Sequence, residues 1–299
     1  MIFKPNFVIS YTHKYELIGL VMTLYTIPYD QFFSFDYNVD LKDYFEKHSN
    51  HCKQPMNELI RKYNLFQSEI LSIGPKTGHE EYWFYKNDCK LTFVDIDEDT
   101  NIEPYLKKLS SNTELASLKF IIDDARNLED YLLPKFDIVY FSSFTPNDIG
   151  NSKIILPRRT LKNRFGRKYN VQFLNNEWPK DVNPLNEITM TILNLHLKDE
   201  GLFIYQSYAS GVDARNSTYL KLIKKQLSEI GVQLLDVYGF EKFPSVHLIV
   251  GFRGTKDKTE KFLESIKNNP EMISFNGRSK GTLGIQKIKK LYSFDYSTD

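Results

Sequence analysis

The feature that most constrains the fold of this chain is a series of short apolar runs separated by stretches with helical periodicity. Val, Ile, Leu and Phe dominate the runs, and the stretches between them carry apolar residues at three- and four-residue spacing. Strands buried on both faces are continuously apolar, and parallel strands need long crossovers between them. The sequence therefore predicts a doubly wound α/β fold with a mostly parallel, seven-stranded sheet. The predicted strands are residues 69–74, 90–97, 118–124, 136–144, 201–208, 232–240 and 246–254.

Other segments flank or interrupt this alternation. Residues 1–65 predict a mainly helical N-terminal cap, in which the apolar stretch 17–27 is too short to span a bilayer and is interpreted as a buried helix. Residues 66–254 would form the Rossmann-like domain, with a polar, basic insertion at 145–183. Residues 255–299 are expected to form a C-terminal extension that begins with a charged helix and is either docked or partly mobile.

Charge and cysteine content narrow the functional classes. The 39 basic and 38 acidic residues nearly cancel, so no global charge favours nucleic acid or a membrane surface as partner. Cys52 and Cys89 lie far apart and form neither a metal knuckle nor a disulfide framework, and the six histidines show no HExxH spacing. We therefore expect no metal site. Because the sequence starts without a signal-peptide pattern, we expect a cytoplasmic protein.

A glycine turn follows the first predicted strand. Residues 69–78 read EILSIGPKTG, and Asp95 ends the next apolar run 21 positions after Gly74. A glycine-rich turn followed by an acidic strand end is typical of nucleotide sites in parallel sheets. Lys76 stands where the dinucleotide fingerprint needs its middle glycine, which disfavours NAD and hence a dehydrogenase. An ordinary strand-to-helix corner is the alternative, and Asp97 competes with Asp95 for the ligand role.

Taken in order, these motifs resemble those of the class I S-adenosylmethionine-dependent methyltransferases. ILSIGPKTG resembles the first motif, VDID the second, IIDDARNL the third and FDIVYFSSF the fourth. Residues 232–254 resemble the terminal antiparallel hairpin, which a plain dinucleotide-binding fold lacks. The resemblance covers roughly residues 60–254 and implies S-adenosyl-L-methionine as the cofactor. The acid that usually begins the first motif is displaced, since Glu69 lies further back and Ser72 precedes Ile73.

The resemblance also implies where the cofactor binds. Gly74 and Gly78 would line the methionine moiety and Asp95 would bind the ribose. The third motif would meet the adenine edge, and the end of the fourth strand would face the methyl donor. The implied cofactor-binding residues are Ser72, Gly74, Pro75, Gly78, Asp95, Ile96, Asp124, Ala125 and Ser142.

Catalytic residues are less well defined. The candidates are Ser142, His79 and Tyr208, because hydroxyls and a histidine near the strand ends can position an acceptor or move a proton. For the hydroxyls the alternative is turn chemistry at a strand end, and for His79 it is a polar role at the start of a helix. The aromatic residues 82–85 point around the whole helix circumference, so we expect them to be packing residues.

The most distinctive local charge is PRRTLKNRFGRK, residues 157–168, which contains no acid. It follows the fourth strand, so we expect it near the catalytic mouth, where it would bind an anionic acceptor. The alternative is a solvated loop. Nucleic acid is possible but not favoured, since six positive charges in one loop are too few to indicate it, and SSFTPND stands where amino-methylating DNA enzymes carry an Asp/Asn-Pro-Pro-aromatic set. The substrate-binding candidates are Arg158, Arg159, Arg164 and Arg167.

The leading hypothesis is therefore a methyltransferase that uses S-adenosyl-L-methionine on a small or polar acceptor, anionic in one interpretation. One alternative is an aminocarboxypropyl transferase of the nicotianamine-synthase-like type. Another is a non-catalytic cofactor-binding or scaffold protein of the same fold, suggested by Lys76 and the displaced acid. The sequence determines neither the acceptor nor the oligomeric state.

Overall fold

The structure is a computed structural model. It describes residues 25–27, 39–75, 78–95, 118–142, 158–162, 168–172, 184–206, 217–240, 246–279 and 282–293. All structural statements below concern these residues.

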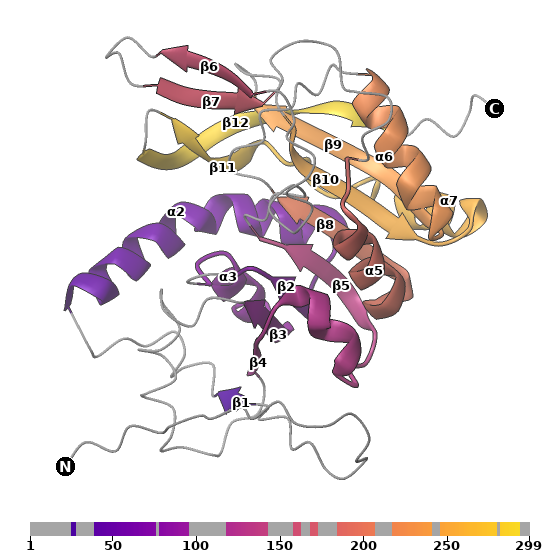
Figure 1. Ribbon diagram of the computed structural model, residues 1–299, viewed down its shortest axis with the longest axis horizontal. Helices are drawn as coiled ribbons and strands as arrows, with labels where there is room; N and C mark the ends of the chain where they lie inside the picture. The colour runs from indigo at the N-terminus through magenta and orange to yellow at the C-terminus, as the bar shows by residue number, and fades with distance from the viewer. Residues whose placement is uncertain are drawn as a thin grey trace.

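A ten-stranded sheet runs through the molecule in the order β1-β4-β3-β2-β5-β8-β10-β9-β12-β11 (Figure 1). All seven predicted strands are present and adjacent in its centre. Neighbouring strands from β4 to β8 are parallel, and β10 is antiparallel to both β8 and β9. The predicted doubly wound sheet and its terminal antiparallel hairpin are therefore confirmed. The seven strands are β2 (Glu69–Ile73), β3 (Lys90–Asp95), β4 (Leu118–Ile122), β5 (Phe136–Phe141), β8 (Leu197–Gln206), β9 (Val232–Phe240) and β10 (Val246–Arg253).

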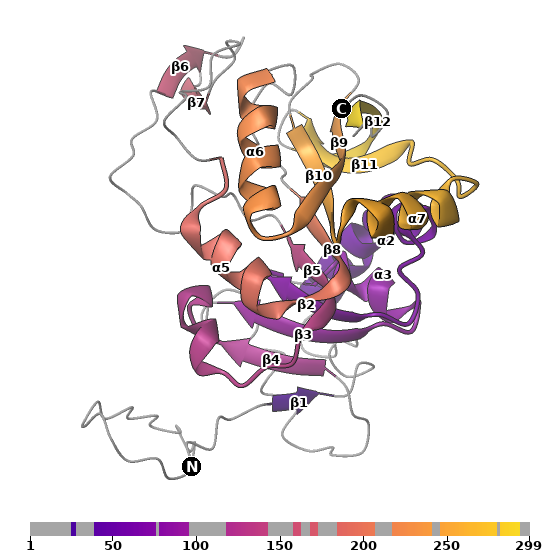
Figure 2. The same ribbon diagram turned by 90° about the vertical axis from the view of Figure 1, so that its right-hand side faces the viewer.

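Helices cover both faces of the sheet, which gives three layers (Figure 2). One apolar core lies under α2 (Val39–Tyr63), α3 (Glu81–Tyr85) and α7 (Lys256–Ile266). The other lies under α5 (Glu187–His196), α6 (Ser217–Glu229) and the short 3-10 helix η1 (Ala125–Asp130). This double coverage explains why the central strands are continuously apolar.

Aromatic packing fixes α3 against the sheet. Phe84 is fully buried and meets the Tyr140 ring of β5 edge to face, with 5.2 Å between ring centroids. Tyr82, Trp83 and Tyr85 are partly buried and pack against the same core. The interpretation of these aromatic residues as packing residues is consistent with these contacts.

Three outer strands of the main sheet, one on one side and two on the other, were not predicted. The stretch 17–27 was interpreted as a helix, but Tyr25–Ile27 form the short strand β1, which pairs antiparallel with β4. That interpretation is wrong for these three residues: their aromatic and β-branched side chains suit a strand, and the unpaired edge of β4 offers hydrogen bonds. Residues 17–24 lie outside the described residues.

Two further strands of the main sheet come from the C-terminal extension, and β6 (Arg158–Lys162) and β7 (Lys168–Gln172) form a hairpin that was not predicted in the basic insertion. β11 (Ser274–Ser279) and β12 (Thr282–Ser293) form a hairpin, and β12 pairs antiparallel with β9. Lys290 of β12 places Nζ 3.1 Å from Asp236 Oδ1, and Tyr63 of α2 donates to Asp236 Oδ2 at 2.7 Å. The described part of the extension is therefore docked on the same body as α2 and β9.

Two helix boundaries also differ from the predicted ones. Within the predicted N-terminal cap, the apolar spacing of residues 40–50 and 56–66 predicts two separate helical stretches, but both fall largely in one helix, α2, with Pro55 inside it. The apolar spacing of residues 184–200 predicts one helix over the whole stretch, but α5 ends at His196 and β8 starts at Leu197. Arg253 stabilises that boundary, because its Nη1 donates to the carbonyl oxygens of Leu193 and Leu197 at 3.0 and 2.9 Å.

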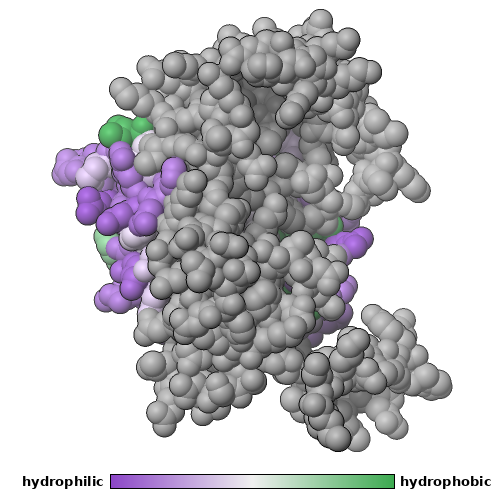
Figure 3. All heavy atoms as spheres, turned by 90° about the vertical axis from the view of Figure 1, so that its left-hand side faces the viewer, coloured by the Kyte–Doolittle hydropathy of each residue, from purple (hydrophilic) through white to green (hydrophobic). Residues whose placement is uncertain are grey.

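Four large hydrophobic side chains of the described residues are exposed. These side chains, Phe66, Leu132, Leu195 and Ile273, come from different segments. On the face in Figure 3, most of the coloured surface is hydrophilic. No helix in the described residues is long and apolar enough to cross a membrane.

Candidate functional site

The glycine turn after β2 has the backbone geometry that only glycine adopts readily. Gly74 and Gly78 have φ of 70° and 67°, in the left-handed region. The Gly78 N–H donates to the Pro75 carbonyl at 2.8 Å, and the Gly78 carbonyl accepts from Tyr82 N at 2.9 Å, which leads into α3. Lys76 and Thr77 lie outside the described residues. The predicted strand–turn–helix unit is thus present.

Three strand ends meet beside this turn. Gly74 N donates to Val94 O of β3 at 2.9 Å, and Ser142 N, after β5, donates to Ile73 O at 3.0 Å. Asp95 is the last residue of β3 and is buried. The sheet order reverses between β2 and β5, and ligands of open α/β sheets bind beyond the carboxyl ends of the strands at such a point. Ile96 and Asp97 lie outside the described residues.

Asp124 and Ala125 follow β4 but form their own local structure. Asp124 caps η1, accepting from Arg126 N at 2.9 Å and from its guanidinium Nε at 2.8 Å. These hydrogen bonds with Arg126 hold the pKa of Asp124 below its ordinary value. Ala125 is half-buried.

The site contains a buried carboxyl group that sequence reasoning missed. Glu80 directly precedes α3, and its side chain turns toward the sheet. Its Oε2 accepts from the Tyr140 hydroxyl at 2.9 Å and from Ser142 Oγ at 3.0 Å, and its Oε1 accepts from the Gln206 amide. Tyr140 also hydrogen-bonds to Gln206 Oε1. Glu80 is therefore held by the ends of β5 and β8.

A second buried carboxyl group lies next to it. Glu81 is fully buried, and its Oε1 accepts from Ser72 Oγ at 2.7 Å. Its Oε2 has no hydrogen-bond partner. Burial is the main cause that raises the pKa of both groups, and the proximity of Glu80 raises that of Glu81 further. We call Glu80 and Glu81 together the acid pair.

Strand register explains why these side chains converge. Ser72 pairs with Tyr140, and Tyr140 pairs with Ile204, in adjacent parallel strands. Since side chains alternate between faces, Ser142 and Gln206, two residues further along, share the face of Ser72 and Tyr140. That face is covered by α3. The signal in the sequence was two consecutive acids beside the turn and polar residues at alternate positions of otherwise apolar runs.

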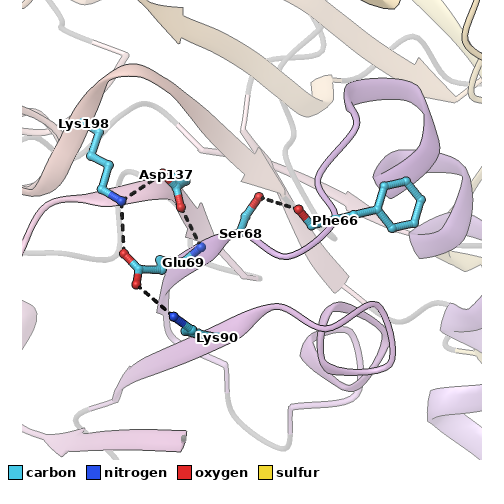
Figure 4. Close-up of polar contacts among 6 residues, drawn as sticks. All are labelled: Phe66, Ser68, Glu69, Lys90, Asp137 and Lys198. Atoms are coloured by element: carbon cyan, nitrogen blue, oxygen red, sulfur yellow. Dashed lines mark hydrogen bonds and ion pairs between the residues drawn. The ribbon is translucent and has the colours of Figure 1, made fainter.

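The displaced acid of the first motif is at the opposite end of the sheet. Glu69 begins β2, and its carboxylate oxygens lie 3.0 Å from Lys198 Nζ and 3.5 Å from Lys90 Nζ. Lys198 also lies 2.9 Å from Asp137, as Figure 4 shows. This cluster ties together the amino ends of β2, β3, β5 and β8. Glu69 therefore cannot act at the carboxyl ends, where the acid pair lies.

The other predicted residues are placed as follows. Ser72 and Ser142 both support the acid pair, and half-buried His79 directly precedes it. Arg158 and Arg159 belong to β6 (Arg158–Lys162), which pairs with β7 (Lys168–Gln172) in a separate hairpin that stands apart from the main sheet (Figures 1 and 2). Tyr208, Arg164 and Arg167 lie outside the described residues.

The site combines two buried acids with neutral polar side chains of the adjacent strands. In the described part of the chain, no group of His, Cys, Asp and Glu is arranged to hold a metal ion. The turn, Asp95 and Ser142 could instead hold an adenosyl ligand, and the acid pair could bind positive charge or exchange a proton.

Comparisons with known proteins give distant structural matches. Fibrillarin of Aeropyrum pernix, solved with natively bound S-adenosyl-L-methionine, matches with a TM-score of 0.40 and 15% identity, over 66% of this chain and 76% of its own. The 1,6-didemethyltoxoflavin-N1-methyltransferase of Burkholderia thailandensis matches with a TM-score of 0.42 and 12% identity, over 72% and 83%. The N-methyltransferase NodS of Bradyrhizobium japonicum WM9 gives 0.41 and 12%, over 71% and 98%.

At these identities and scores, the matches bear on neither the reaction nor the substrate of this chain. No protein-family model matches the sequence, and no curated protein matches it significantly. The fold follows from the structure itself. The order of β4, β3, β2, β5, β8, β10 and β9, with β10 antiparallel to both its neighbours, is that of the class I S-adenosylmethionine-dependent methyltransferase fold.

Proposed function

We propose that this protein is a methyltransferase that transfers the methyl group of S-adenosyl-L-methionine to a small or polar acceptor. One observation carries the proposal. The turn with left-handed Gly74 and Gly78 lies beside the buried Asp95, at the point where the strand order reverses. A turn without side chains permits close approach of a ligand, and a carboxylate can bind two ribose hydroxyls.

The proposed cofactor position follows from this geometry. The methionine moiety lies over Gly74, Pro75 and Gly78, and the ribose lies at Asp95. Ile96, outside the described residues, stays a cofactor-binding candidate from the sequence. The adenine lies toward Asp124 and Ala125. The cofactor carries no phosphate, so the turn need not meet the glycine spacing of a dinucleotide site. Methyl transfer then depends mainly on holding the acceptor in line with the sulfonium.

The proposed acceptor side is the end of β5 and β8. Ser142 reaches this edge from β5, and its hydroxyl already donates to Glu80 at 3.0 Å. His79 and Tyr208 are the further candidates for positioning or proton transfer. Arg158, Arg159, Arg164 and Arg167 remain candidates for an anionic acceptor, since guanidinium groups bind carboxylate and phosphate in two-point contacts.

Calorimetry with S-adenosyl-L-methionine tests the cofactor site. Asp95→Ala should weaken binding roughly 10- to 100-fold, because hydrogen bonds to a charged group are lost. Asp130→Asn, at an exposed position in η1, is the matched control and should bind as the wild type does. Folded wild-type protein that binds no adenosyl compound would refute the proposal and favour a scaffold role.

Product analysis tests the reaction. Incubation with candidate acceptors should release S-adenosylhomocysteine as the methyl group is transferred. Methylthioadenosine as the product would instead show transfer of the aminocarboxypropyl group. Replacing Arg158 and Arg159 together by Ala should raise KM for an anionic acceptor. An unchanged KM would show that these two residues of the β6–β7 hairpin do not bind the acceptor.

A further inference from the structure

The hydrogen-bond ring around Glu80 requires a proton on that carboxyl group. Glu80, Tyr140 and Gln206 are joined pairwise by three contacts, and each contact needs one hydrogen. The Tyr140 hydroxyl has one hydrogen to donate. Gln206 makes one contact with Tyr140 and one with Glu80, and its amide nitrogen can donate in only one of these two. If the amide oxygen and nitrogen of Gln206 are interchanged, the nitrogen donates in the other contact, and the number of hydrogens available for the three contacts stays the same. An ionised Glu80 therefore leaves one contact without hydrogen, whereas a protonated Glu80 completes the ring.

In Glu81, by contrast, the feature that lacks a partner is one of the carboxyl oxygens. Its Oε1 is held by Ser72, but its fully buried Oε2 has no hydrogen-bond partner. A buried carboxylate oxygen without donor or counter-ion is unfavourable, and it points to a ligand that supplies positive charge. Ser142, which donates to Glu80, also lowers the pKa of Glu81, so both carboxyl groups lie near the Ser142 hydroxyl.

The described surroundings of the acid pair provide no counter-ion. β2 contributes the neutral donor Ser72, β5 contributes Tyr140 and Ser142, and β8 contributes Gln206. Burial and the nearby Glu80, Glu81 and Cys52 raise the pKa of Tyr140, and half-buried His79 directly precedes the pair in the chain. Among the described residues, no Lys or Arg contributes to the pKa of either glutamate.

We propose that the acid pair recognises the positive charge of the ligand, the ammonium or the sulfonium group of the adenosyl cofactor, and that the cation binds in exchange for a proton. This inference rests on the proposed function. In this proposal, the acid pair at the start of α3 takes the role of the acid that is displaced from the first motif. It also makes cofactor binding dependent on pH.

The exchange balances in charge. A monocationic group enters beside the pair, one carboxylic acid loses its proton to solvent, and the carboxylate that forms is neutralised by the cation. No bond of the ligand breaks in this step. The number of protons released can therefore be measured from calorimetric heats in buffers of different ionisation enthalpy.

Three ligands distinguish the source of the charge. S-adenosylmethionine carries both cations, S-adenosylhomocysteine carries the ammonium alone, and methylthioadenosine carries neither. The wild-type protein should release about one proton near neutral pH with S-adenosylmethionine and none with methylthioadenosine. Release with S-adenosylhomocysteine assigns the ammonium, and its absence there assigns the sulfonium.

The variant Glu81→Gln removes the charge and keeps the shape. It should weaken S-adenosylmethionine binding roughly 10- to 100-fold and reduce proton release, while methylthioadenosine binding stays the same. Glu69→Gln is the matched control, since Glu69 lies at the other end of the Ser72 strand. It should behave as the wild type with all three ligands.

The outcomes separate this inference from the function on which it rests. If all three ligands bind the wild-type protein without proton release, the inference is overturned and the adenosyl site stands. If none binds, both are overturned. The proton count uses the wild-type protein alone, so it decides the question even if Glu81→Gln does not fold.

Discussion

Replacing Glu81 by Gln should change how the stability of the unliganded protein depends on pH. Glu81 is fully buried, and its pKa is raised from 4.5 to about 8 by burial and by the neighbouring Glu80. The folded protein therefore keeps a proton on this group in a range of pH in which the unfolded chain has lost it. The contribution is fully present below the unfolded pKa and is lost as pH rises toward the folded pKa.

The magnitude follows from linkage. One proton retained in the folded state and not in the unfolded state changes the free energy of unfolding by ~1.4 kcal/mol per pH unit. Between about pH 5.5 and pH 7.5, the wild type should therefore lose roughly 2 to 3 kcal/mol that Glu81→Gln does not lose. The glutamine keeps the acceptor for Ser72 Oγ, so the change is mainly in charge.

Urea unfolding at a series of pH values, followed by circular dichroism, measures this difference. The free energy of unfolding of Glu81→Gln relative to wild type should rise steadily with pH. Glu260→Gln, at an exposed position of α7, is the control and should follow the wild-type curve. Parallel curves for wild type and Glu81→Gln would show that Glu81 is ionised without penalty and would refute the reasoning.

Three further substitutions test the framework around the site. Gly78→Ala should destabilise the fold by ~1–2 kcal/mol in urea unfolding, since φ is 67° there; an unchanged midpoint would contradict the left-handed turn. Tyr63→Phe should cost ~1–3 kcal/mol, because the buried Asp236 loses a donor at 2.7 Å; no loss would mean that water replaces the hydroxyl. Arg253→Lys should lower Tm by a few degrees, because a lysine cannot cap several carbonyl groups at the end of α5 at once. An unchanged Tm would show that Arg253 does not stabilise this helix end.

The sequence by itself determined the sheet. Seven apolar runs became seven adjacent strands, because strands covered on both faces must be apolar throughout, and this leaves a local pattern. The glycine turn was equally local: Gly74 and Gly78 have the left-handed backbone that only glycine adopts at little cost. The outer strands β1, β12 and β11 were missed, since pairing at the outside of a sheet depends on the partner that a strand finds rather than on its own periodicity.

Tertiary structure alone decided the composition of the candidate site's interior. Ser72 and Ser142 were selected by their place in motifs, but Glu80, Glu81 and Tyr140 were not. Their role depends on which side chains share one face of adjacent strands and on how deeply α3 is buried. A single glutamate in a sequence is normally an exposed charge. Burial beside a second glutamate and neutral donors turns it into a proton-holding group, because desolvation acts through the whole surrounding structure.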